Sequence, residues 1–126
     1  LSFWANQAVE YPVFAPYSSF VETVFLPQLA IVGWAVLLTE VALGTFLILG
    51  LATRAWAAVG IIQTIAIALS VLNAPDEWHW GYILMGVGHL VLLLAAAGRT
   101  WGIDGLLRPI WVQAPGRVSR LMSVLS

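Results

Sequence analysis

The sequence predicts an all-α protein that crosses a membrane as a helix bundle, and three observations support this. Hydrophobic residues make up 61% of the chain and charged residues 9%, with no lysine, whereas soluble domains carry about 25% charged residues. Three long apolar runs, 29–50, 55–72 and 81–97, each rise by roughly 25–33 Å as helices, which is enough for a bilayer core of about 30 Å. Four of the five acidic residues outside the runs also lie in segments that contain no arginine. The whole chain, 1–126, is then one membrane domain.

The N-terminal segment 1–28 is the least regular part of the chain. Three prolines interrupt it: Pro12, Pro16 and Pro27. Proline removes a backbone donor that lipid cannot replace, so we expect this segment not to span. We expect an extracytoplasmic connection at the membrane interface, in which Ser18 or Ser19 caps a short helix that ends at Phe25.

The three apolar runs are the expected transmembrane helices. A turn containing Arg54 separates the first from the second, and Pro75 breaks the chain before the third. Gly98 follows the third run and is a candidate helix C-cap. The tail 110–126 has apolar residues at i, i+3, i+4 and i+7, namely Val118, Leu121, Met122 and Leu125. This spacing predicts a short amphipathic helix on the cytoplasmic membrane surface or against a partner.

The distribution of charge predicts the orientation of the spans. All five arginines follow the first or the third span: Arg54, Arg99, Arg108, Arg117 and Arg120. Two spans separate these loops, so they lie on one side of the membrane, which the positive-inside rule makes cytoplasmic. Four acids fall on the other side: Glu10, Glu22, Asp76 and Glu77.

Several function classes find no support in the sequence. No basic patch suits nucleic acid, since the net charge is −1. The lack of cysteine excludes disulfides and thiolate metal sites within the chain. Phosphate-binding loops and nucleophile elbows are absent too. We therefore predict no catalytic residues and no metal site, and expect the chain not to catalyse a reaction by itself.

Each apolar run carries one strong polar residue near mid-depth: Glu40, Gln63 and His89. From the helical rise, the three lie within about 6 Å of a common depth, so their side chains can meet if all face inward. Gly60, Thr64 and Ala68 form a ridge of small residues one position from Gln63, which favours close helix approach.

Two interpretations of this polar layer remain open. In the structural one, Glu40 bonds His89 or Gln63 and fixes the helix register, although such bonds average only about 0.6 kcal/mol. In the functional one, Glu40, Gln63 and His89 form a site for a quinone head group or a proton relay. One histidine and one carboxylate fall short of a usual metal ligand set.

Two motifs give the chain a resemblance to a known family. Gly50–Ala57 reads GLATRAWA after the span that contains Glu40, and Gly98–Pro109 reads GRTWGIDGLLRP after the last span. Their order and spacing resemble the DoxX-like membrane proteins, over roughly Pro12 to Pro109. The resemblance implies a four-helix bundle whose first helix would precede residue 1. Segment 1–28 would then join the first two helices, in a multi-pass protein of a prokaryotic plasma membrane.

The functions of that family give two expectations. Some relatives are subunits of thiosulfate:quinone oxidoreductase, so the chain is expected to be a small membrane subunit of a quinone-linked or other membrane redox complex. It would act as an anchor and line a quinone pocket, with lipids and other subunits as partners. Other relatives are linked to redox defence or assembly. The alternative is therefore a non-catalytic accessory or assembly subunit that packs against a larger respiratory or photosynthetic membrane complex.

Overall fold

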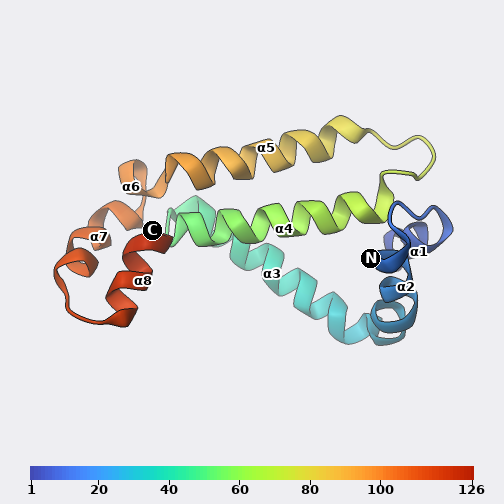
Figure 1. Cartoon of the computed structure of the whole chain (residues 1–126), viewed down its shortest axis with the longest axis horizontal. Helices are drawn as coiled ribbons and strands as arrows, with labels where there is room; N and C mark the ends of the chain where they lie inside the picture. Colours follow the sequence, from blue (N-terminus) through green and yellow to red (C-terminus); the bar gives the residue numbers. More distant parts are fainter.

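A computed structural model describes every residue from Leu1 to Ser126 and confirms the all-α prediction. Three long helices dominate it: α3 (Leu29–Leu49), α4 (Thr53–Val71) and α5 (His79–Ala95). Figure 1 shows α4 in the middle, with α5 running alongside it. Helix α3 meets α4 at the α3–α4 turn and diverges from it toward the opposite end (Figure 1). This divergence leaves room between α3 and α4.

The boundaries of the long helices lie close to those predicted for the spans. Helices α3 and α4 are long and apolar enough to cross a membrane, and α5 is a shorter apolar helix. The prediction that Gly98 caps the third span is wrong. Ala96, with φ 46°, takes the left-handed conformation that ends α5, and Gly98 is the first residue of α6 (Gly98–Trp101).

The segment before the first span contains the expected short helix but is more helical than predicted. Helix α1 covers Ser2–Glu10, and α2 covers Ala15–Phe20. The helical path then continues through a wide π turn, Val21–Phe25, and a 3₁₀ turn, Leu26–Gln28, directly into α3. In a regular α-helix the Pro27 ring would meet the carbonyl of Thr23. The wider turn gives that ring room, as π turns within helices do.

The predicted serine cap is not formed. Phe14, in an extended conformation, is the residue before α2, and a proline occupies its first turn. Ser18 lies inside the helix, with its hydroxyl 3.5 Å from the Phe14 carbonyl. Proline has a φ suited to the first turn of a helix and no N–H that needs a partner there. The proline therefore sets where α2 starts.

The N-terminal elements close the open end between α3 and α4. Ala5 and Ala8 of α1 pack against Val21 of the π turn. The Tyr17 hydroxyl donates to the Ala66 carbonyl of α4 at 3.0 Å. These contacts hold α1 and α2 across the wide end of the α3–α4 angle (Figure 1).

The other end is fastened by a buried aspartate. Asp104 lies in the first turn of α7 (Ile103–Gln113) and is fully buried. Its carboxylate accepts the backbone N–H groups of Ala52 and Thr53 at 2.7 and 2.8 Å, and its own N–H donates to the Gly50 carbonyl at 2.9 Å. Asp104 thus supplies the cap of α4 from a distant part of the chain.

Glycines allow this close approach. A Cβ atom added to Gly98 would overlap the Thr53 hydroxyl, and one added to Gly102 would overlap the backbone of Gly50. Gly50 itself has φ 64°, the left-handed conformation that glycine adopts without strain. The two motifs that carry the family resemblance therefore form one interlocked joint.

The predicted amphipathic tail is split between α7 and α8 (Arg117–Leu125). Met122 and Leu125 are half-buried, whereas Val118 and Leu121 are 75% and 58% exposed. Part of the apolar stripe of α8 therefore packs against the protein, and the rest of it is exposed on the surface.

Few residues are buried, and charge is separated along the molecule. Only 15 of 126 residues are buried, and α3 and α5 bury none, so their apolar faces need a lipid or protein cover. The helices with the arginines gather at one end in Figure 1, and α1, α2 and the α4–α5 connection lie at the other. This agrees with a membrane protein whose two ends lie in different aqueous phases.

Candidate functional site

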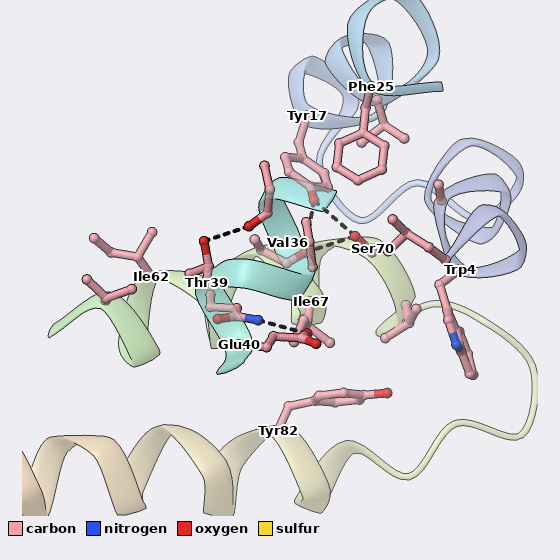
Figure 2. Close-up of a pocket in the computed structure, with 18 residues that line it drawn as sticks. Trp4, Tyr17, Phe25, Val36, Thr39, Glu40, Ile62, Ile67, Ser70 and Tyr82 are labelled. Atoms are coloured by element: carbon pink, nitrogen blue, oxygen red, sulfur yellow. Dashed lines mark hydrogen bonds between the residues drawn. The ribbon is translucent and has the colours of Figure 1, made fainter. Parts of the chain in front are cut away.

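A cavity of about 520 Å³ lies between α3 and α4 where the two helices diverge (Figure 2). Eighteen residues line it, and fourteen of them are hydrophobic. Helix α1, the α2 segment and the π turn close its wide end, and Tyr82 reaches it from α5. A concave, mostly apolar space with a few polar groups is the usual form of a small-molecule site.

Glu40 and Gln63 form the polar centre of this cavity. The Gln63 amide nitrogen donates to a Glu40 carboxylate oxygen at 2.9 Å, which joins α3 to α4 (Figure 2). The other amide atom, Gln63 Oε1, is buried and has no hydrogen-bond partner. Glu40 itself is exposed in the isolated chain. The pair therefore retains polar capacity that the protein does not use.

Further polar groups lie around the apolar wall. The Tyr17 hydroxyl lies 3.0 Å from the Ser70 hydroxyl. Thr39, one residue before Glu40, donates to the Ala35 carbonyl at 2.8 Å. The Tyr82 hydroxyl donates to Glu77 at 2.6 Å. The cavity thus has hydroxyl groups at its edges and a carboxylate–amide pair at its centre.

His89 does not join Glu40 and Gln63. Its ring packs on the small-residue ridge of α4, so closely that a Cβ atom at Gly60 would overlap it. Its Nδ1 atom lies 3.5 Å from the Thr64 hydroxyl. The cavity wall does not include His89. Of the three predicted site residues, the structure brings Glu40 and Gln63 together. It packs the third, His89 of α5, against Gly60 and Thr64 on another face of α4.

Sequence reasoning missed Tyr17 and Ser70. Tyr17 lies in a segment predicted to be an interfacial connection, and nothing in its sequence neighbourhood relates it to α4. Ser70 does carry a signal, because it is a hydroxyl residue within the second apolar run. Hydroxyl side chains between membrane helices commonly bond a neighbouring helix. No three histidine, cysteine, aspartate or glutamate residues are grouped as they would be around a metal ion.

Comparison with known families and structures places these features in context. The family model described as "TQO small subunit DoxD" matches residues 9–121. No solved structure matches the chain. The matched range contains Glu40, Gln63 and the glycine–aspartate joint at the other end, and it confirms the DoxX-like resemblance.

Proposed function

Because this chain belongs to the DoxD family, the small subunits of thiosulfate:quinone oxidoreductase, we propose that it is the small membrane subunit of a quinone-linked redox complex. In this role the chain anchors the complex in the membrane, and the cavity between α3 and α4 receives the quinone head group. Other subunits of the complex are its partners and supply the electrons.

The observation that carries the proposal is the Glu40–Gln63 pair in an otherwise apolar cavity. The cavity volume of about 520 Å³ lies within the range of small-molecule sites, roughly 300–1,000 Å³. A quinone needs an apolar wall for its ring and tail, and polar groups for its two carbonyl oxygens. The unpaired Gln63 Oε1 can accept a hydrogen bond from a hydroxyl group of the reduced quinone. The Glu40 carboxylate can exchange a proton with that quinone hydroxyl. An intramembrane carboxylate is costly, which favours a functional use.

A second candidate is a non-catalytic accessory subunit, and the exposure of Glu40 favours it. A carboxylate exposed at mid-depth needs a cover in the bilayer, and a helix of a larger membrane protein would provide one. In that case Glu40 binds a polar group of the partner helix, and its loss weakens the assembly.

Membrane placement is part of the same proposal. The chain lies in a prokaryotic plasma membrane with Arg54, Arg99 and Arg108 on the cytoplasmic side, as the positive-inside rule requires. Glu10 and Asp76 then face the opposite compartment. The cavity between α3 and α4 extends to the wide end of the two helices, which lies nearer that outer side.

The test is turnover of the purified complex with the substitution Glu40→Gln. This change keeps the shape and removes the exchangeable carboxyl proton, so we expect quinone turnover to fall roughly a hundredfold, as for loss of a general acid–base group. The complex should copurify intact. Glu22→Gln is the matched control, because Glu22 is exposed on the π turn and does not line the cavity.

The outcomes separate the two candidates. Full turnover in the Glu40→Gln complex would reject the quinone role. Loss of copurification, without a turnover defect in the complexes that remain, would favour the accessory role. A photoreactive azidoquinone gives an independent readout, because it should label residues of α3 and α4 such as Val36 or Ile67, which line the cavity.

A further inference from the structure

A second cavity, of about 300 Å³, lies at the arginine-rich end of the molecule, beside α7. Six residues line it, and only one of them is hydrophobic: Arg99, Gly105, Arg108, Pro109, Val112 and Gln113. It is separate from the cavity between α3 and α4 and shares no residue with it. Its wall contains two guanidinium groups, one amide and no carboxylate.

Positive charge around this cavity exceeds negative charge, since Arg54, Arg99 and Arg108 act on one another and Asp104 is the one acid that acts on Arg99. The acid at this end, Asp104, uses both carboxylate oxygens for the backbone N–H groups of Ala52 and Thr53. The pKa of the Arg99 guanidinium is lowered from its usual value by burial first and then by the charges of Arg108 and Arg54. Asp104 opposes this shift only as the last contribution. The arginines therefore repel one another in the absence of an anion.

The arginines also retain donors that the protein does not use. Arg99 donates through Nε to the Ser126 carbonyl at 2.8 Å, which fixes the side chain and leaves its terminal nitrogens available. Arg108 Nε is buried and has no hydrogen-bond partner. A buried donor without an acceptor is costly, and a charged one more so. Two guanidinium groups with free donors match the oxygen atoms of a phosphate group.

The position of the cavity indicates where such a phosphate comes from. Trp101 of the neighbouring α6 is 95% exposed, and α8 exposes Val118 and Leu121 at the same end of the molecule (Figure 1). Exposed tryptophan and an amphipathic helix are typical of the membrane–water interface. Phospholipid phosphates lie at this depth, and basic pockets there bind anionic head groups.

We propose that Arg99 and Arg108, with the Gln113 amide at the rim, bind the phosphate group of an anionic phospholipid from the leaflet at the arginine-rich end. The lipid supplies the acceptor that Arg108 Nε lacks and neutralises the cluster. Its acyl chains then run along the apolar surface of the helices.

The proposal is tested by native mass spectrometry of the purified full-length chain titrated with phosphatidylglycerol. We expect Arg108→Gln to weaken binding about tenfold, the effect of losing one charge-assisted hydrogen bond. Arg120→Gln is the matched control, since Arg120 lies at the same end but outside the cavity, and should change binding less than twofold. Equal losses in the two variants would mean general attraction to anionic lipid and would overturn the proposal.

Two further arms make the result specific. Phosphatidylcholine, which has the same phosphate but no net charge, should bind at least tenfold more weakly, and equal binding would overturn the proposal. Inorganic phosphate at the lipid concentration should not displace phosphatidylglycerol, and displacement would assign the site to a free anion instead.

A third variant guards against misfolding. Gln113 is exposed on the cavity rim, so Gln113→Glu introduces a negative charge there without disturbing packing. It should reduce phosphatidylglycerol binding at least as much as Arg108→Gln. Undiminished binding by Gln113→Glu would overturn the proposal, whatever the stability of Arg108→Gln.

Discussion

Asp104 is a fully buried carboxylate of α7 that bonds the first backbone N–H groups of α4. A helix N-terminus leaves N–H groups without partners, and α4 has no side-chain cap of its own. Asp104 bonds two backbone N–H groups there, and its negative charge lies at the positive end of the α4 dipole. Burial removes water as an alternative partner, so these bonds have no substitute.

Replacement of Asp104 by alanine should therefore destabilise the protein strongly. Each hydrogen bond to a charged group contributes about 1.5–3 kcal/mol, so the loss of two should cost at least about 3 kcal/mol. The free energy of unfolding, measured by denaturant titration in detergent micelles, tests this. Glu22→Ala, an exposed acid on the π turn, should change it by less than about 0.5 kcal/mol. A similar effect of both substitutions would contradict the capping role.

Residue depth was predictable from the sequence, but residue direction was not. The helical rise places Glu40, Gln63 and His89 at similar depths, and two of them do meet. Depth alone does not give the rotation of each helix about its axis. The small-residue ridge at Gly60 and Thr64 draws α5 onto that face of α4 and takes His89 with it. Sequence spacing therefore did not show that Glu40 would pair with Gln63 and not with His89.

At the scale of elements, the contact of α4 with α5 depends on a glycine, Gly60, which has no side chain to separate the two helices. Gly60 lies in the middle of α4 and is buried under the His89 ring. Helices in membranes associate mainly through close packing, which small residues permit. Any larger side chain at residue 60 has to push α5 away or force His89 into another rotamer.

Gly60→Ala should therefore destabilise the α4–α5 pair. Overpacking costs typically 1–3 kcal/mol, and the helix propensity of alanine returns up to about 1 kcal/mol. Because the added Cβ would overlap several atoms of the His89 ring, we expect the upper end of this range, a net loss of about 2 kcal/mol. Gly88→Ala on α5 is the matched control, because nothing lies within 4 Å of a Cβ there. Thermal unfolding in detergent should show a lower midpoint for Gly60→Ala and an equal or higher one for Gly88→Ala. The reverse order would disprove this packing.

Element types followed from the sequence, whereas two element boundaries did not. Long apolar runs define α3, α4 and α5 because a helix satisfies its backbone hydrogen bonds within one segment, as lipid requires. Pro27 predicted a break, yet a π turn absorbs the proline and the helix continues. Gly98 predicted a helix end, yet this glycine serves close contact with Thr53. Both errors have the same cause. A proline or glycine in a sequence is compatible with a helix end, a helix distortion or a close contact, and tertiary packing decides which of these occurs.

At the scale of the whole molecule, the two ends differ in chemistry and in construction. The acidic end is closed by α1 and the α2 segment, which border the larger cavity. The other end is a joint of glycines and Asp104, beside a cavity lined by arginines. Separation of charge along the helix axes gives the molecule a defined orientation relative to a membrane.

This orientation can be measured with single cysteines, because residues 1–126 contain none. Pro75 and Pro115 form a matched pair, since both are exposed prolines in linkers, one at each end of the molecule. We expect a membrane-impermeant maleimide to label Pro75→Cys in intact cells and to label Pro115→Cys only after the membrane is opened. The physical reason is that translocating the five arginines across the membrane is far less favourable than translocating the acidic end. Labelling of Pro115→Cys in intact cells would invert the topology and move the arginine-lined cavity to the outer leaflet.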